Sequence, residues 1–417
     1  MHSGSGRGVS RRDALRYALA GFGIAALGPT VRASALARPS GAPRVGQKFL
    51  VIVELDGGND WLNTVVPQGL ANYTTKRPAI ALDGGATLAL DSGTYATTEF
   101  RLHGSMAGLA QAYRDGELAI VRKVGYQQAN KSHDTSRKIW AQGLRNAVNG
   151  NGWIARYAEQ QAPTALGAVS IGVGRHRALA GGSVDPLSVG SLQSFRFDAD
   201  TRYNNNHLHR LEGIRELLAA RGATASRDAV LAGHALAGQI KDAVDNYSST
   251  VTYRTGSLSN RLIDVARMVQ AGFETRIYYT KLSGFDTHGA QLARHVTLLQ
   301  ALDEGITDLA DDLRAMGVWN DAVILVMSEF GRRIFENGSG GTDHGEAGCM
   351  LLAGGAVRGG LHGPALIDAD LDDDNLDYGI DFRSIYANVL AAHLGVADPT
   401  QVFPEALEIA ATPDLIL

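Results

Sequence analysis

The chain has 417 residues, a formal net charge of −4, 45% hydrophobic residues and 20% charged residues. These values are ordinary for a globular protein, and the near balance of acids and bases gives no reason to expect nucleic acid or an anionic membrane as a partner. The length suits one large α/β domain or two smaller ones. Cys349 is the only cysteine, which excludes an intramolecular disulfide, and its place in the apolar run 349–353 predicts a buried core thiol.

The first forty residues predict a twin-arginine export signal. Arg11 and Arg12 stand just before an Ala/Gly-rich apolar stretch, residues 17–27, which is followed by small residues that offer cleavage sites. We therefore expect a signal peptide over residues 1–35 and a flexible linker over residues 36–46. The apolar stretch is shorter than the roughly 20 residues of a stable membrane span, although an uncleaved anchor is an alternative. The sequence predicts a periplasmic or extracellular protein that meets the twin-arginine translocase during export and keeps no stable membrane span.

Residues 47–417 alternate strand-like and helix-like segments. Strands are predicted over residues 49–55, 118–121, 169–173, 277–282, 322–327 and 349–353, and helices over residues 106–113, 135–142, 210–221, 229–244 and 292–316. The continuous apolar strands and the strand–helix–strand unit at 277–327 are typical of parallel sheets. We therefore predict one α/β domain with a mostly parallel sheet covered by helices on both faces, and a largely helical insertion or cap over residues 150–260.

Acids and histidines follow the predicted strands at several strand ends. The residues concerned are Asp56 and Asp60 after the first strand, Ser132, His133 and Asp134 at the start of the helix after the second, Asp286 and His288 after the strand at 277–282, Glu329 and Arg332 after the strand at 322–327, and Asp343 and His344 in the next loop. Because ligands of open parallel sheets bind at the carboxyl ends of strands, we expect these residues to share one site.

Carboxylates together with imidazoles are typical of a divalent-metal site, and we expect one or two ions, with zinc, manganese, iron or calcium as candidates. The spacing of Asp286 and His288 lets both side chains of an extended segment point the same way. Ser132, at a helix N-terminus, suits an oxyanion site or a nucleophile. Arg332 or Lys131 could clamp a phosphate or sulfate group.

Several of these residues also have plain structural interpretations. Asp134 could be a helix N-cap and Asp60 a loop cap. His133 and Glu329 could belong to a buried hydrogen-bonded network. The acidic run 370–374 fits a solvated loop, and calcium binding there lacks the usual EF-hand spacing.

These motifs occur in one order, and the chain thereby resembles a known family. L-D-G-G-N-D, S-H-D, G-F-D-T-H-G, S-E-F-G-R and T-D-H-G, behind a twin-arginine signal, resemble the DUF1501 family of exported bacterial proteins, which is related to the alkaline phosphatase and sulfatase superfamily. The resemblance covers nearly all of the mature chain and is weakest between residues 150 and 250. It implies a three-layer α/β/α sandwich of the alkaline phosphatase type and metal-assisted hydrolysis of phosphate or sulfate esters.

The resemblance also implies roles for single residues. It matches Asp56, Asp286, His288, Glu329 and His344 to metal ligands and Ser132 to the nucleophile. From the residues themselves we add Asp343 to the predicted ligands, and His133 and Arg332 to the predicted catalytic residues. Phe330 departs from the pattern, because the superfamily has a metal-binding histidine there. Either Asp343 or His133 replaces that ligand, or only one metal binds, or the chemistry has changed.

The leading hypothesis is an exported metal-dependent hydrolase that acts on a small or polymeric phosphate or sulfate ester. The alternative is a non-catalytic envelope protein that binds a glycan, an anionic polymer or a partner protein on the same fold. A metal protein with redox or elimination chemistry is a third interpretation.

Overall fold

A computed structural model describes residues 39–145, 150–161, 164–184, 186–195, 216, 225–405 and 414–417. The predicted signal peptide, residues 1–35, and all but one residue of the helix predicted over 210–221 lie outside this part of the chain. Within it, no helix has both the length and the apolar character that a membrane crossing requires.

The predicted linker is attached to the domain where it is described. The backbone N–H groups of Ser40 and Gly41 donate to the carbonyls of Gly272 and Ala271, at 3.2 and 3.0 Å. These hydrogen bonds join residues 40 and 41 of the predicted linker to the end of a helix.

The main sheet of the described residues has nine strands, in the order β11-β5-β10-β9-β1-β8-β6-β7 with β12 beside β5. The strands are β1 Phe49–Asp56, β5 Leu118–Gly125, β6 Ala168–Ile171, β7 Leu187–Val189, β8 Ile277–Ser283, β9 Ala322–Met327, β10 Gly348–Ala353, β11 Gly360–His362 and β12 Ile380–Asp381. All six predicted strands are present. The pairs are parallel except where β10 meets β9 and β5. The loop that joins β9 to β10 contains no helix to carry the chain back across the sheet, and β10 runs antiparallel to β9.

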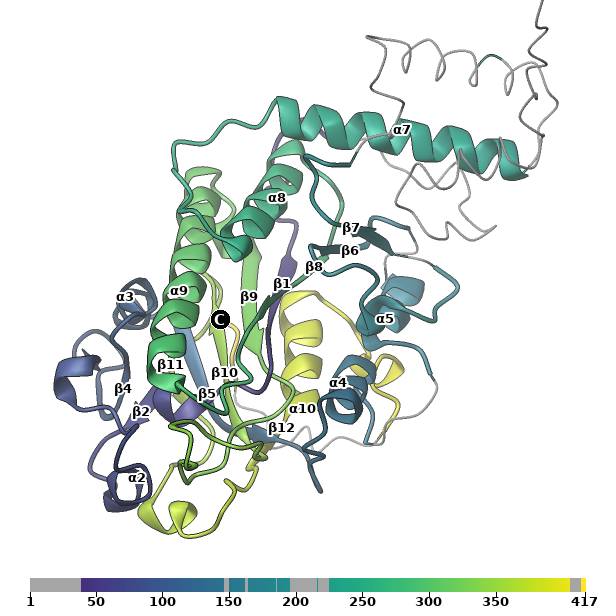
Figure 1. Cartoon of the computed structure of the whole chain (residues 1–417). Coiled ribbons are helices and arrows are strands. Elements are labelled where there is room, and N and C mark those ends of the chain that lie inside the picture. Colours follow the sequence, from purple (N-terminus) through teal and green to yellow (C-terminus); the bar gives the residue numbers. More distant parts are fainter. Residues whose placement is uncertain are drawn as a thin grey trace, which may run out of the picture.

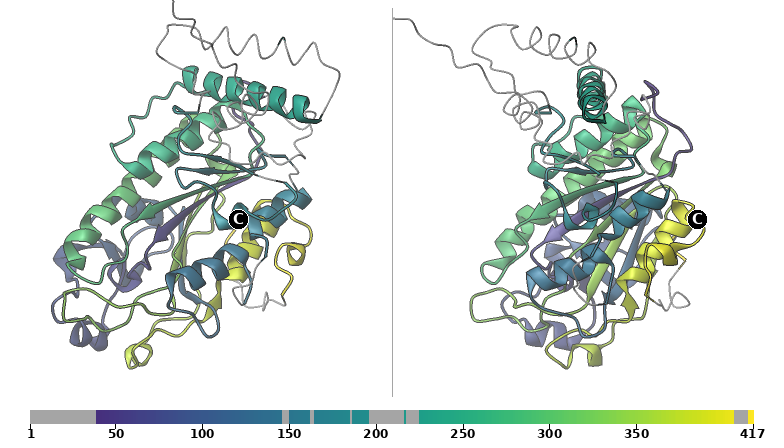
Figure 2. Two further views of the ribbon diagram at one scale, coloured as in Figure 1. Left: turned by 45° about the vertical axis from the view of Figure 1, so that its right-hand side comes forward. Right: turned by 90° about the vertical axis from the view of Figure 1, so that its right-hand side faces the viewer.

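Helices cover both faces of this sheet, as predicted for the α/β class (Figures 1 and 2). One face carries α3 Ala107–Arg114, α8 Ser257–Ala271 and α9 Gln291–Ala315, and the other carries α4 His133–Gln142, α5 Trp153–Gln161 and α10 Phe382–Asn388, which a π-helix, Val389–His393, continues. Alternate side chains of β1 serve the two cores: Val51 and Val53 pack under α8 and α9, and Leu50 and Ile52 pack under α4 and α10.

The region between residues 150 and 260 is only in part the helical insertion that was expected. Two of its segments, β6 and β7, are parallel strands at the edge of the main sheet, because their buried apolar residues extend the sheet beyond β8. The long helix α7 Ala225–Asp245 packs against α8 at one end of the molecule (Figure 1).

A small antiparallel sheet lies beside the main one. Its strands, in the order β2-β4-β3, are β2 Val65–Pro67, β4 Thr97–His103 and β3 Thr87–Leu90, and the short helix α2 Ala71–Lys76 lies near them (Figure 1). Short 3-10 helices at Trp61–Asn63, Gly84–Ala86, Arg177–Leu179, Trp319–Asp321, Asp368–Leu371 and Pro399–Gln401 complete the described elements.

Candidate metal centre

The site forms where four parallel strands end. β1, β5, β8 and β9 run in one direction, so their carboxyl ends lie at the same edge of the sheet, and β10 begins there because it runs the opposite way. Asp286 follows β8, His133 is the first residue of α4, and His344 precedes β10. The topology therefore brings these three side chains together from distant parts of the sequence.

One carboxylate and two imidazoles form the core of the site. Each of His133, Asp286 and His344 offers a ligand atom, and these atoms all lie within 4.8 Å of one another. His288 joins them, since its Nε2 lies 3.0 Å from Nε2 of His344 and 3.1 Å from Oδ1 of Asp286. Of the expected ligands, the structure thus brings Asp286, His288 and His344 together with His133.

Each of the three imidazoles is held at its other nitrogen. Nδ1 of His133 lies 2.8 Å from Oε1 of Glu329, and Nδ1 of His344 lies 2.8 Å from the carbonyl oxygen of Lys131. Nδ1 of His288 lies 2.9 Å from Oδ1 of Asp343. Because these three partners are acceptors, each Nδ1 carries the proton and each Nε2 presents a lone pair. Metal-bound histidines are held in this same way.

The atoms that converge on the site are therefore all acceptors. Nε2 of His344 lies 3.1 Å from Oδ1 of Asp286, and the buried Nε2 of His133 has no hydrogen-bond partner among the described residues. Lone pairs this close repel one another unless a cation lies between them. Ligands at about 2.0 Å from a tetrahedral zinc ion would be about 3.3 Å apart, close to the observed spacing. Burial lowers the pKa of His344, which keeps the imidazole neutral, the form that binds metal.

Arg332, expected to be catalytic, is instead fully buried beneath Asp286. Its guanidinium donates to the backbone carbonyls of Gly57, Gly58, Phe285 and Thr342, and to Oδ1 of Asp286 at 2.6 Å. Burial raises the pKa of Asp286, but the hydrogen bond and the positive charge of Arg332 outweigh this and hold the pKa of this carboxyl below its usual range. Arg332 thus orients Asp286, and its side chain is too deeply buried to clamp a substrate.

Asp56, expected as the first metal ligand, faces two cations. Its Oδ2 accepts hydrogen bonds from Lys281 at 2.8 Å and from Ser283 at 2.9 Å, and its Oδ1 forms an ion pair with Arg137. Burial raises the pKa of Asp56, but the hydrogen bond from Lys281 and the charge of Arg137 outweigh this and lower it. The structure does not bring Asp56 into the group formed by His133, Asp286 and His344.

Glu329 and Asp343, also expected as ligands, support the histidines. Glu329 has no exposed side-chain surface, and its carboxylate accepts from the backbone N–H groups of Gly57 and Gly58 at 3.1 Å as well as from His133. These bonds occupy both carboxylate oxygens of Glu329, which leaves neither free to bind a metal. Asp343 is held by His288 and, at 3.1 Å, by Asn337. Both carboxylates therefore orient imidazoles.

Phe330, at the position where a metal-binding histidine was expected, forms the apolar wall of the site. Its ring is buried and lies against His133 and His344, with ring centroids 4.9 and 4.7 Å apart. A Cβ on Gly58 would come within 2.2 Å of this ring, so the glycine makes room for it. Phe330 cannot bind metal itself, but it restrains the rings of His133 and His344, which can.

Ser132 is the exposed N-cap of α4, and its side chain makes no capping hydrogen bond. It stands between Lys131, whose carbonyl holds His344, and His133. Asp134, considered as the N-cap, lies in the first turn and pairs with Lys138 at 2.8 Å.

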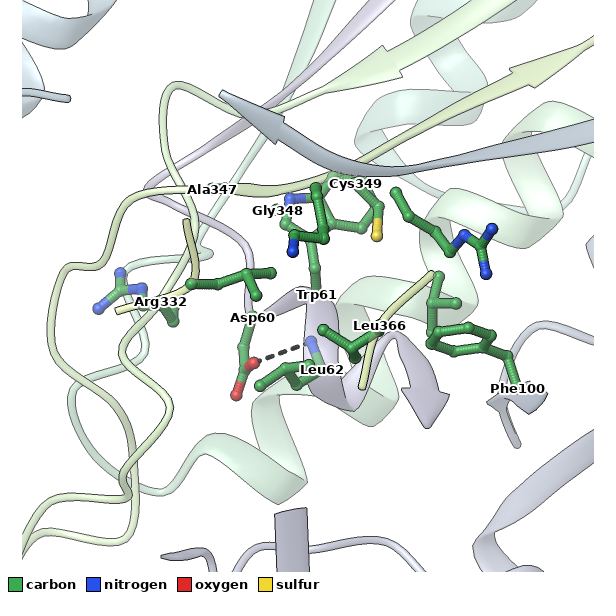
Figure 3. Close-up of a pocket in the computed structure, with 13 residues that line it drawn as sticks. Asp60, Trp61, Leu62, Phe100, Arg332, Ala347, Gly348, Cys349 and Leu366 are labelled. Atoms are coloured by element: carbon green, nitrogen blue, oxygen red, sulfur yellow. Dashed lines mark hydrogen bonds between the residues drawn. The ribbon is translucent and has the colours of Figure 1, made fainter. Parts of the chain in front are cut away.

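Asp60 has the capping role that was considered for it. Oδ1 of Asp60 accepts from the backbone N–H of Leu62 at 3.2 Å, which Figure 3 shows as a dashed line, and Oδ2 pairs with Arg77 at 2.6 Å. The cavity drawn there has a volume of only about 20 Å³ and accommodates a single water. Cys349 lines it and is partly buried rather than fully buried as predicted, and burial raises the pKa of its thiol to about 12.

Sequence reasoning missed two residues, Arg137 and Lys281. Arg137 stands four residues after His133 in α4, a spacing that places both on one face of the helix, so the pattern could have found it. Lys281 lies two residues before the end of β8 and carries no such signal.

A protein-family model matches most of the chain. Residues 47–405 match the family model described as "Protein of unknown function (DUF1501)". The chain belongs to this family. No curated protein matches it in sequence.

Several solved structures are similar to the chain at low sequence identity. Ps i-CgsB in complex with k-i-k-neocarrahexaose is 10% identical to the chain. The match covers 88% of this chain and 75% of the Ps i-CgsB chain, with a TM-score of 0.41. A protein of the alkaline phosphatase superfamily from Vibrio parahaemolyticus is 9% identical, covers 97% and 79%, and has a TM-score of 0.36. The PsFucS1 sulfatase from Pseudoalteromonas sp. is 12% identical, covers 91% and 71%, and has a TM-score of 0.33.

Proposed function

We propose that this protein is a metal-dependent hydrolase of phosphate or sulfate esters that works outside the cytoplasm. The observation that carries the proposal is the convergence of Nε2 of His133, His288 and His344 on the Asp286 carboxylate, while Nδ1 of each ring faces a hydrogen-bond acceptor. A divalent cation held there would supply Lewis-acid chemistry, which favours attack on an ester by withdrawing charge from its oxygens.

The protein's own residues would do the remaining work. Glu329, the Lys131 carbonyl and Asp343 fix the tautomer of the three imidazoles, and Arg332 fixes Asp286. The hydroxyl of Ser132, exposed at the N-terminus of α4, is the candidate nucleophile. Attack by the Ser132 oxygen, or by water in its place, would form a new bond to phosphorus or sulfur and break the bond to the ester oxygen, which leaves as the alcohol with the proton of the attacking group. In the serine case a water molecule would then release phosphate or sulfate from Ser132.

The test begins with metal and then asks about turnover. Protein purified without chelators is analysed for bound metal, then assayed with zinc, manganese or calcium on aryl phosphates, phosphodiesters and aryl sulfates. We expect one ester class to be hydrolysed, and His133→Ala to abolish both the metal and the activity. His362→Gln is the matched control, because His362 lies on β11 and donates only to nearby backbone carbonyls.

A non-catalytic binding protein is the competing outcome. Metal that binds in the wild type and is lost in His133→Ala, with no ester hydrolysed by any metal form, would favour it. An active protein with no bound metal would contradict the proposal.

A further inference from the structure

Asp56 lies in an ion-pair cluster that the metal centre does not use. We call Asp56, Arg137, Lys281 and Ser283 the Asp56 cluster. Lys281 and Ser283 extend from β8, and Arg137 extends from α4. Arg137 also reaches Glu329, with Nη2 at 3.1 Å from Oε1.

The charges of this cluster argue against a second metal ion at Asp56. Arg137 and Lys281 both pair with Asp56, so Asp56 has no unpaired negative charge to attract a divalent cation. A metal bound by Asp56 would also lie beside a guanidinium and an ammonium group. Such like-charge proximity weakens cation binding.

The same two cations keep donors that face solvent. Their side chains are 35% exposed in Arg137 and 32% exposed in Lys281. Among the described residues, the Lys281 ammonium bonds only to Asp56, and Nη1 of Arg137 bonds to none. Exposed guanidinium and ammonium donors are the groups that bind phosphate and sulfate oxygens.

The cluster and the metal centre share the His133 ring. Nη2 of Arg137 lies 3.5 Å from Nδ1 of His133, whose opposite nitrogen, Nε2, faces the metal centre. One imidazole ring therefore separates the guanidinium from the metal centre. A tetrahedral anion presents oxygens in several directions, so it can face a cation at Nε2 with one oxygen and Arg137 with another.

We infer that the Asp56 cluster is the oxyanion subsite of a one-metal centre, in which Arg137 and Lys281 bind the phosphate or sulfate group of the substrate. Asp56 holds these two cations in place and ligates no metal. This inference rests on the proposed function for its substrate class. Arg137 and Lys281 would then supply the positive charge that a second metal ion provides in a two-metal centre.

The first arm of the test measures metal binding. Metal per chain is determined by equilibrium dialysis against zinc for the wild type, Asp56→Asn and the double variant Arg137→Gln/Lys281→Gln. We expect one zinc in each protein, because none of these residues holds it. Loss of zinc in Asp56→Asn, or a second zinc in the double variant, would overturn the inference.

The second arm measures anion binding to the zinc-loaded protein by calorimetry, with inorganic phosphate and inorganic sulfate as probes. We expect Arg137→Gln and Lys281→Gln each to weaken the preferred anion by more than about 10-fold, as loss of a hydrogen bond from a charged donor does. Lys138→Gln, which removes an exposed lysine of the same helix, is the matched control and should change the affinity less than about 2-fold. The tighter of the two probes indicates the ester class.

Arg137 touches the buried Glu329, so Arg137→Gln could disturb the fold. Arg137→Lys, which keeps the charge, and Lys281→Gln, which leaves Glu329 untouched, are measured beside it with thermal unfolding as a check. Unchanged anion binding in folded Lys281→Gln and folded Arg137→Lys would overturn the inference. If anion binding depends on these residues but no ester is hydrolysed, the hydrolase proposal fails and the subsite stands. If esters are hydrolysed and anion binding is unchanged in the variants of Arg137 and Lys281, the subsite inference fails and the hydrolase proposal stands.

Discussion

Asp56 and Asp286 lie at the carboxyl ends of neighbouring parallel strands, β1 and β8, and face opposite partners. Asp56 pairs with Arg137 and Lys281, whereas Asp286 faces imidazole nitrogens that present lone pairs. The first carboxylate pairs with two cationic side chains, whereas the second pairs with Arg332 alone and lies beside imidazole nitrogens that can bind a metal ion. A carboxylate at a strand end therefore becomes a metal ligand or a salt-bridge partner according to which charges the neighbouring elements bring to it.

The largest effect should come from exchanging each carboxylate for its amide. Asp286→Asn removes the negative ligand, so zinc affinity should fall by more than about 100-fold, beyond what changes outside the ligand shell produce. Asp56→Asn should leave the zinc affinity within about 3-fold, because that carboxylate ligates nothing. Competition with a chromophoric chelator measures both dissociation constants. Equal losses in the two variants would end the distinction between the carboxylates.

The loop between the two regions should be the next most sensitive. Gly58 has a φ of +77°, and a Cβ there would lie 2.2 Å from the Phe330 ring, so Gly58→Ala should lose about 3 kcal/mol of unfolding free energy. Gly69 has a φ of +73° with open space around it, and Gly69→Ala should lose only about 1 kcal/mol. Urea unfolding compares them. Equal losses would mean that the Phe330 ring does not fill this space.

A substitution at Glu329 tests whether this residue orients His133 for metal binding. Glu329→Gln keeps the shape but weakens the hold on Nδ1 of His133, so zinc affinity should fall by about 10- to 100-fold. Asp134→Asn, an exposed carboxylate of the same helix, is the control and should leave the affinity unchanged. Circular dichroism checks that both variants are folded. A Glu329→Gln protein with wild-type zinc affinity would contradict the orienting role.

The smallest effect concerns acid stability on the Asp56 side. The pKa of Asp56 is lowered in the folded state, so its contribution to stability is complete above the unfolded pKa and is lost as the pH falls through the folded one. Asp56→Asn should therefore reduce the loss of stability below about pH 4, by up to about 1 kcal/mol. Thermal unfolding of the wild type and the variant between pH 7 and pH 3 measures this difference. An unchanged acid dependence would mean that the ion pairs contribute nothing.

Much of the fold could be predicted because buried strands are nearly pure apolar runs. The segments β1, β8 and β9 stand out in the sequence, and the apolar stripe of α9 fixed the helix between the last two. The direction of β10 could not be predicted, since it depends on the absence of a helix in the preceding loop. The strands β6 and β7 are short, and their place at the sheet edge depends on pairing with distant β8.

The sequence predicted the location of the candidate site better than the roles of its residues. Strand ends carrying acids and histidines identified the edge of the sheet and the residues Asp286, His288 and His344. The roles of Asp56 and Arg332 could not be read from the sequence, because each is decided by partners more than 40 positions away: Arg137 and Lys281 for Asp56, and the carbonyls around Gly57 for Arg332. His133 was predicted as a catalytic residue and as one of two alternatives for the missing ligand, since only the fold shows where its Nε2 points.

Crystals soaked in zinc, measured for anomalous scattering, would test the central claim most directly. We predict one zinc peak per chain, bounded by His133, Asp286 and His344, and no peak at coordination distance from Asp56. Two peaks about 4 Å apart, one of them bound by Asp56, would contradict the one-metal account and would indicate a two-metal centre.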